Sequence, residues 1–293
     1  MSFRPSMILV ACCIALTACG RDDDSGPEHR AEGVFRYERA MPAGQTLMLR
    51  NLAGAITVEP ATDDTLRIVG DLTWRGDDRQ PTDVSFRADT SATGALVCAI
   101  VGDGRCTADN FSSNSSGNRI TFGKRGLSLG FGGRKRARVH FAVRVPAGVK
   151  LDLVLVEGNI VSASTAPVRA RGVNGNVTIV TSVGPVQAEN VNGNVDARMT
   201  TLSGSDSVKV STVNGSVFAF LPETADATVE MRTTNGSVVS DFPTAVGSGQ
   251  RFDKVIRATL GAGTTPVRVR SVNGNAQLRR LDAAGRAYEL PEP

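Results

Sequence analysis

The sequence predicts an all-β protein built as a two-sided, parallel β-helix-like solenoid, and three observations support that fold class. Apolar and polar residues alternate along most segments after Gly33, as in residues 138–145 and 267–270. This period of two is typical of half-buried strands. No stretch of the chain after the N-terminal segment shows the apolar spacing of an amphipathic helix over three turns. A short motif centred on Asn-Gly recurs through the second half of the chain, and such repeats indicate stacked structural units.

The repeated motif has the form Val-Asn-Gly-Asn/Ser-Val. From Gly158 to Gly236 the spacings between its glycines are 17, 18, 22 and 21 residues, and Gly274 follows after 38, which is twice 19. Weaker turn signals lie about halfway between the motifs. Each rung is therefore expected to contain strand, turn, strand and turn in roughly 18–22 residues, with an Asn-Gly corner. The predicted corner residues are Asn174, Gly175, Asn192, Gly193, Asn214, Gly215, Asn235, Gly236, Asn273 and Gly274.

Antiparallel hairpins closed by Asn-Gly turns are the alternative, because Asn-Gly is a strong hairpin signal. A meander, however, does not need the same turn sequence at every second turn only. Apolar residues on both sides of the motif, such as Val173 and Val177, also fit corners around a core. In a solenoid with rungs ~4.8 Å apart, the asparagines form a side-chain ladder and the glycines supply positive φ. Residues 177–181 and 195–199 are then expected to run parallel.

The first 18 residues are expected to be a signal peptide. Their apolar run, residues 7–16, is too short for a transmembrane helix, which needs ~20 residues. Residues 16–19, Leu-Thr-Ala-Cys, resemble the lipobox of bacterial lipoproteins, and this resemblance implies that Cys19 is acylated and anchors the protein to a membrane. The alternative is an ordinary secretory peptide. The residue after Cys19 is Gly20 and not Asp, and in lipoproteins this resemblance favours sorting to the outer membrane.

The remaining chain is expected to comprise an acylated tether (19–32), a β-solenoid adhesin-like domain (33–281) and a C-terminal tail (282–293). Within the domain, the Gly/Ser-rich stretch 109–136 is expected to form an irregular loop that ends in a basic cluster. The cluster is a candidate contact for anionic lipopolysaccharide, phospholipid or peptidoglycan, and the alternative is a solvated hairpin. Its residues are Lys124, Arg125, Arg134, Lys135 and Arg136.

Only Cys98 and Cys106 remain of the five cysteines once the signal peptide is removed and Cys19 is acylated. Separated by eight positions with glycines between them, they are expected to form a local hairpin disulfide in an oxidising compartment. The alternative is a pair of buried free thiols. Their spacing does not match a zinc motif, and no metal site is expected.

The lipobox followed by Gly-Asn-Val/Ile and Asn-Gly-Asn/Ser-Val repeats resembles the bacterial "putative adhesin" family of β-strand-repeat proteins. The resemblance covers roughly residues 33–281 and is most secure over 150–240 and 265–277. Residues 52–56, Leu-Ala-Gly-Ala-Ile, resemble a degenerate first repeat. The resemblance implies a β-solenoid-like fold and a location in the cell envelope, and it carries no catalytic residues.

The composition offers little material for catalysis. The chain has two His, one Trp and two Tyr, and its net charge of +4 is too mild to indicate a nucleic-acid partner. The outer faces are expected to be charge-neutral and poor in aromatic residues. Five carboxylates scattered among the repeats show no recurring pair of the kind that glycosidases use: Asp152, Glu157, Glu189, Asp196 and Asp206.

The sequence thus predicts a non-catalytic, lipid-anchored β-repeat protein of the outer membrane, without cofactor, that binds or scaffolds an envelope component as adhesins do. Its partner is expected to be the membrane, through the lipid, and an envelope polysaccharide or protein. The alternative is a β-solenoid enzyme acting on envelope glycans.

Overall fold

The structure is a computed structural model that describes residues 27–76, 79–115, 118–123, 126–129, 137–202, 207–243 and 254–281. The expected signal peptide (1–18), the lipid-attachment residue Cys19 and the tail (282–293) lie outside these ranges. All regular secondary structure in the described residues is β-strand, and the all-β fold class is confirmed. The basic cluster of the 109–136 stretch also lies outside the described residues: Lys124, Arg125, Arg134, Lys135 and Arg136.

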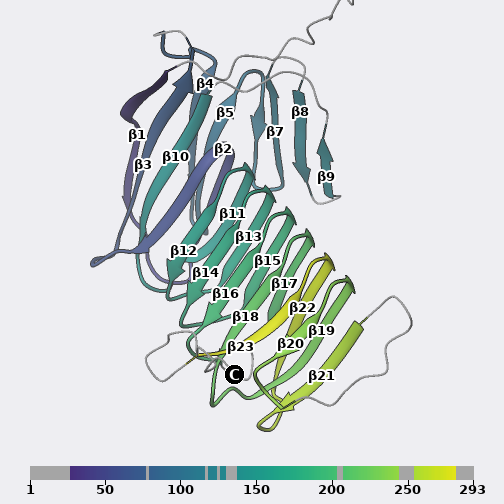
Figure 1. Ribbon diagram of the computed structural model, residues 1–293. Helices are drawn as coiled ribbons and strands as arrows, with labels where there is room; N and C mark the ends of the chain where they lie inside the picture. The colour runs from purple at the N-terminus through teal and green to yellow at the C-terminus, as the bar shows by residue number, and fades with distance from the viewer. Residues whose placement is uncertain are drawn as a thin grey trace, which may run out of the picture.

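The N-terminal half forms an end block on the solenoid (Figure 1). Its strands are β1 (Glu28–Ala40), β2 (Thr46–Pro60), β3 (Thr65–Arg75), β4 (Val84–Ser91), β5 (Gly94–Val101), β6 (Arg105–Cys106), β7 (Asn110–Ser115), β8 (Asn118–Gly123), β9 (Gly126–Leu129) and β10 (Ala137–Val145). The expected tether (19–32) overlaps β1, because residues from Glu28 onward already pair with β3.

The second half supplies the rungs of the solenoid after the first one, and the additional strand β21. Their strands are β11 (Lys150–Glu157), β12 (Ile160–Ser164), β13 (Val168–Asn174), β14 (Val177–Thr181), β15 (Val186–Asn192), β16 (Val195–Met199), β17 (Val208–Asn214), β18 (Val217–Pro222), β19 (Ala227–Asn235), β20 (Val238–Ser240), β21 (Lys254–Leu260), β22 (Thr265–Asn273) and β23 (Ala276–Leu281).

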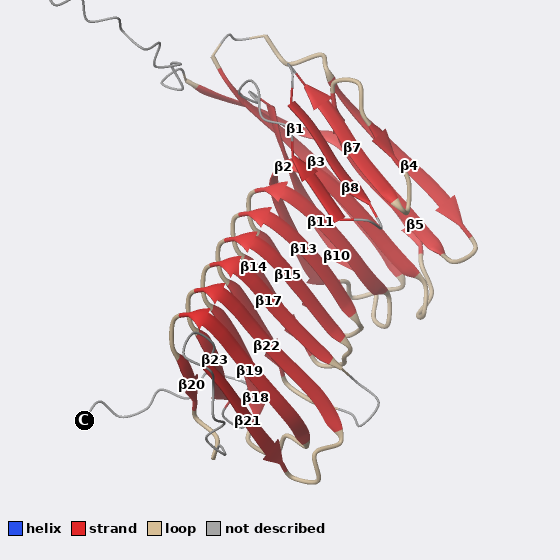
Figure 2. Ribbon diagram, turned by 90° about the vertical axis from the view of Figure 1, so that its right-hand side faces the viewer, coloured by secondary structure: helices blue, strands red, loops and turns tan. Residues whose placement is uncertain are grey.

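Two long sheets run along the molecule and share β2. Sheet A has the order β1–β3–β10–β2–β12–β14–β16–β18–β23–β20. Sheet B has the order β4–β5–β2–β11–β13–β15–β17–β22–β19–β21. Apart from β21, the rung strands are parallel within each sheet, as Figure 2 shows for their stacked array. The two-sided solenoid is confirmed, including the parallel pairing of residues 177–181 with 195–199.

The first rung is a single bent strand. Residues 46–53 of β2 pair with β11 in sheet B, and residues 56–58 pair with β12 in sheet A. The bend falls at Gly54, whose φ is 122°. The degenerate first repeat at residues 52–56 therefore occupies the corner position of the rungs that follow.

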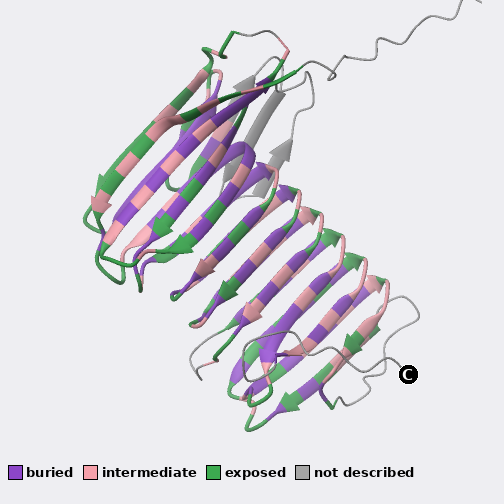
Figure 3. Cartoon of the chain, turned by 60° about the vertical axis from the view of Figure 1, so that its left-hand side comes forward, coloured by how far each residue is buried: buried purple, intermediate pink, exposed green. Residues whose placement is uncertain are grey.

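The side chains between the two sheets form a continuous core, and Figure 3 shows the resulting alternation of buried and other residues along the rung strands. Val177 and Val195, which follow the Asn-Gly corners, point into this core and are 1% and 0% exposed. The valines that precede the corners were expected there too, but they face outward. Val173 is buried on the outer side, whereas Val213 is 40% exposed. The strand alternation requires this, because an inward residue stands just before each of these valines.

At the corners, three sets of hydrogen bonds join neighbouring rungs. The predicted asparagine ladder is present, with Asn192 Nδ2 donating to Asn174 Oδ1 at 2.8 Å and equivalent bonds at the later rungs. A second ladder was not predicted. In it, the side chain of the residue after the glycine accepts a hydrogen bond from a backbone N–H of the next rung, and Asn194 N donates to Asn176 Oδ1 at 2.9 Å. In a third, buried side chains cap the glycine carbonyls, as Thr212 does for Gly193.

The last rungs are not stacked in sequence order, contrary to what a regular coil would give. Between Gly236 and Gly274, the residues that the structure describes form no additional rung but the strand β21, which pairs antiparallel to β19. The chain then turns through Gly261 and Gly263, both at positive φ, and returns as β22 and β23. These two strands lie between the β17–β18 rung and the β19–β20 rung (Figure 1).

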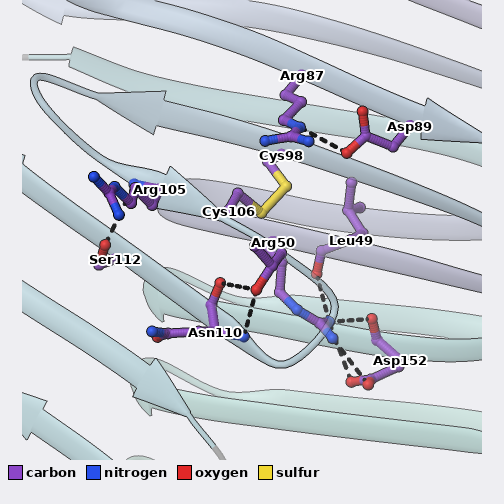
Figure 4. The surroundings of a disulfide bond; sticks show 11 residues. Leu49, Arg50, Arg87, Asp89, Cys98, Arg105, Cys106, Asn110, Ser112 and Asp152 are labelled. Carbon is purple, nitrogen blue, oxygen red and sulfur yellow. Dashed lines mark hydrogen bonds and ion pairs between the residues drawn. A yellow bond between two sulfur atoms is a disulfide. The ribbon is translucent and has the colours of Figure 1, made fainter.

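A disulfide joins Cys98 of β5 to Cys106 of β6, as predicted (Figure 4). Strands β6 to β9 form a separate antiparallel sheet. The expectation of an irregular loop over residues 109–136 is therefore wrong for the described residues between Asn110 and Leu129, because these form β7, β8 and β9. Cys106 and Phe111 from this sheet pack in one buried cluster with Val154 and Val156 on the outer side of β11. The disulfide therefore ties the small sheet to sheet B where it covers the first rungs.

Replacing Gly193 by alanine is expected to destabilise the protein more than replacing Gly44. Both glycines have positive φ, and alanine in such a conformation costs about 1–2 kcal/mol. At Gly193 an added Cβ would also lie 2.1 Å from the carbonyl oxygen of Gly175, whereas at Gly44 it would meet nothing within 4 Å. The overpacking should add about 1–3 kcal/mol, measured by urea unfolding. Equal losses in the two variants would show that the corner backbone moves apart without strain.

The double substitution Cys98→Ala/Cys106→Ala is expected to lower the free energy of unfolding by about 2–3 kcal/mol, because the unfolded chain regains the entropy that closure of this short loop removes. Reduction of the wild-type protein should give the same loss. Peptide mapping without reductant checks the bond itself, and recovery of both cysteines alkylated would contradict it.

Candidate functional site

The outer face of sheet B carries two columns of aligned side chains, one residue per rung in each. The first, here called the groove column, consists of Asp152, Arg169, Gln187, Lys209, Arg268 and Glu230. The second column consists of Val154, Arg171, Glu189, Ser211, Arg270 and Arg232. The two columns arise because each holds one position of the repeat. The groove column lies five residues before the corner asparagine of each rung, or before its equivalent Glu157, and the second column lies three residues before it. Parallel register stacks these equivalent positions on neighbouring rungs.

This face is basic, which corrects the expectation of charge-neutral faces. The two columns together hold six cations and three carboxylates, although the whole chain has a net charge of only +4. Two cation pairs stand directly opposite each other on neighbouring strands: Lys209 with Arg268, and Arg270 with Arg232. Like charges at such positions oppose sheet formation. The core and the corner hydrogen bonds therefore hold together a face whose own charges repel.

A groove of about 390 Å³ follows the groove column across β11, β13, β15, β17 and β22. Its lining includes four cations and one carboxylate: Lys150, Arg169, Lys209, Arg268 and Asp152. Pro167, Pro185 and Pro266 line the groove where the strands begin. None of the described residues that line the groove is aromatic.

Three of the groove cations are available to a ligand. Lys209 Nζ is held by Glu189 Oε1 at 2.9 Å. By contrast, Lys150, Arg169 and Arg268 form no ion pair with any carboxylate in the described part of the chain, and all three are exposed. Charge-assisted hydrogen bonds to carboxylates or phosphates are the strongest contacts that such side chains make.

One end of the groove column is closed by a buried ion pair. The Arg50 side chain is 2% exposed, and its Nη2 lies 2.9 Å from Asp152 Oδ2 (Figure 4). Asp152 also pairs with Arg171 at 3.5 Å. Burial lowers the pKa of Arg171, as do the neighbouring Arg169 and Arg50 charges, whereas Asp152 raises it. Asp152 is thus committed to neutralising the buried Arg50 and the half-buried Arg171. Arg50 was not among the residues singled out from the sequence, because it lies outside the recognisable repeats.

Glu189 is the carboxylate nearest the centre of the face. Burial raises its pKa, but hydrogen bonds from Lys209 and Gln187 and the charges of Lys209 and Arg169 together lower it by more. The pKa of Glu189 therefore lies below its usual value. A catalytic acid in a glycosidase needs the opposite, a raised pKa. The ionised Glu189 instead serves to hold Lys209 in place.

The other carboxylates singled out from the sequence are also paired where the structure describes them. Glu157 binds Arg138 at 2.6 Å, and Asp196 binds Arg198 at 3.1 Å on the outer face of sheet A. Asp206 lies outside the described residues. Within the described ranges, no group of three or more His, Cys, Asp or Glu side chains is placed to hold a metal ion. Nor do these ranges contain a helix long and apolar enough to cross a membrane.

The corner residues singled out from the sequence are brought together in one stack. The part of the chain that contains this stack is also the part that matches a known protein family. Residues 154–279 match the Toastrack DUF4097 family. This Toastrack region runs from β11 to β23, and it agrees with the resemblance of the Asn-Gly repeats to adhesin-like proteins of unknown function. The match is compatible with a non-catalytic, adhesin-like module.

One solved structure, described as a "putative cell adhesion protein" from Clostridium sporogenes ATCC 15579, aligns with this chain at a TM-score of 0.43 and 10% identity. The alignment covers 84% of this chain and 99% of that chain. No curated protein matches the sequence.

Replacing Lys209 by methionine is expected to raise the pKa of Glu189, because the variant removes a hydrogen bond and a positive charge while the burial of the carboxyl stays. Carboxyl ¹³C NMR titration measures the shift. The Arg198→Met variant on sheet A is the control and should leave the pKa of Glu189 unchanged. An unaltered Glu189 pKa in the Lys209→Met variant would refute this account of the face.

Proposed function

We propose that the protein is a lipid-anchored, non-catalytic module of the bacterial cell envelope that binds or scaffolds an envelope component through the repeated outer faces of its solenoid. The observation that carries the proposal is the alignment of equivalent outward positions on six consecutive rungs of sheet B. A rigid array of this kind suits a repetitive or extended partner, since many weak contacts act together.

The pairing of the carboxylates supports a non-catalytic role. Hydrolysis of a glycan needs one carboxyl that is protonated and a second that is free to act as base or nucleophile. On the solenoid, Asp152, Glu157, Glu189 and Asp196 are each engaged by a basic side chain. The single tryptophan, Trp74, is 8% exposed and belongs to the core of the end block, so it offers little surface for stacking a sugar ring.

The proposed location follows from the N-terminal sequence. Leu-Thr-Ala-Cys at residues 16–19 supplies the lipid-attachment residue Cys19, and Gly20 after it favours the outer membrane. A cysteine carrying several acyl chains gives stable anchoring, whereas a single chain is marginal.

Replacing Cys19 by serine is expected to move the protein from the membrane fraction to the soluble periplasmic fraction, because the anchor is lost. Fractionation and immunoblotting after a carbonate wash measure this. If the variant still sediments with washed membranes, the lipid anchor is refuted.

Binding through sheet B is tested by photo-crosslinking in intact cells. A photoreactive residue at Gln187, on the groove column, should capture an envelope component, whereas one at Thr57, exposed on sheet A, should not. Capture at Thr57 alone, or at neither position, would contradict the proposed use of sheet B.

A further inference from the structure

We infer that the groove of sheet B binds a linear, polyanionic glycan that lies along the solenoid axis, with its carboxylate or phosphate groups on successive rungs. This rests on the proposed function, because the envelope location is what makes a glycan available. It names the class of ligand for the same face.

The spacing of the cations selects an extended ligand. Arg169, Lys209 and Arg268 stand in one column, with Gln187 between the first two. Since parallel rungs are ~4.8 Å apart, the column from Arg169 to Arg268 spans about 14 Å. A single small anion would engage only one end of such a row. A chain with charges repeated along its length engages all of them and gains from their combined effect.

The electrostatics of the groove favour an anion over a neutral ligand. Lys209 and Arg268 are in direct register, and their repulsion is relieved when a negative group lies between them. Lys150 and Arg169 add two further exposed cations that form no ion pair with a described carboxylate. Guanidinium groups suit carboxylate and phosphate because they donate paired hydrogen bonds.

The lining argues against single-stranded nucleic acid and for a glycan that is held by its charges rather than by ring stacking. Proteins that bind single-stranded nucleic acid stack the bases on aromatic side chains, and the described lining of this groove has none. A flexible acidic peptide would lose much conformational entropy on binding. A planar membrane surface would not enter a groove. Gln187, whose amide already donates to Glu189, adds the kind of polar group that meets sugar hydroxyls.

The experiment compares variants of the full chain that all carry Cys19→Ser, so that acyl chains contribute nothing. Binding to immobilised polygalacturonate, a linear polycarboxylate, is measured by biolayer interferometry over a series of salt concentrations. The groove variant is Arg169→Gln/Lys209→Gln/Arg268→Gln. The control, Arg36→Gln/Arg79→Gln/Arg144→Gln, removes the same charge from exposed positions that do not line the groove.

We expect wild type and control to bind polygalacturonate and not neutral dextran, with affinity that falls as salt rises. The groove variant should bind about tenfold more weakly or worse, with a shallower salt dependence. Should that variant fold poorly by circular dichroism, Gln187→Glu places one negative charge in the middle of the column and should also weaken binding. Equal binding by groove and control variants would overturn the inference.

Two further probes distinguish other ligands. If an oligothymidylate or vesicles containing phosphatidylglycerol bind through the groove and polygalacturonate does not, the ligand class is wrong. The proposed function would still stand if crosslinking at Gln187 captures an envelope component. Its use of sheet B would be contradicted if that crosslinking fails, whatever the outcome with polygalacturonate.

Discussion

The contact on which the structure depends is the close approach of neighbouring backbones at the Asn-Gly corners. Each Asn-Gly corner glycine that is followed by another rung in the stack donates its N–H to a carbonyl of that rung, as Gly193 does to Asn214 at 2.8 Å. On its other side, a Cβ on Gly193 would lie 2.1 Å from the carbonyl oxygen of Gly175. Only glycine fits there, and it also supplies the positive φ of the bend. A slip of one residue would place a side chain in this gap and turn every inward valine outward, so the corners set the register of both sheets.

Strict register has a consequence for the outer face. Because equivalent residues are stacked at every rung, any bias in composition at one position of the repeat becomes a column. Basic residues at the positions equivalent to Arg169 and Arg171 thus form a charged surface, although the cations are scattered along the sequence. The stacked amides of Asn174 and Asn192 are the neutral counterpart of this effect, with a hydrogen bond where the cations repel. Rigidity gained at the corner permits a repulsive column a short distance along the strand.

Much of the fold could be predicted because each corner is specified by a few neighbouring residues that can be recognised in the sequence. Asn-Gly at regular spacing predicts the bend, the parallel stack and the asparagine ladder, and the disulfide follows from which cysteines remain. The basic face could have been found by aligning the repeats on Asn174, Asn192 and Asn214 and comparing the positions before them. Net charge conceals it, because acidic residues elsewhere balance the sum. Arg50 could not be found in this way, since its partner Asp152 lies 102 residues away and no motif links them.

The order of the final rungs was not predictable from the motif, and the reason is physical. The corner at Gly274 is chemically equivalent to that at Gly236, so either rung fits against Gly215. What decides the order is the antiparallel strand β21, which reverses the chain and delivers β22 between β17 and β19. A regular solenoid grows by adding rungs to an end, each held by one earlier neighbour. Here β22 and β23 have partners on both sides, so the β19–β20 rung has no place in the stack until the end of the repeat region is inserted. The C-terminal rungs must therefore form together. Because they are interleaved, the part of the solenoid farthest from the end block is a cooperative unit.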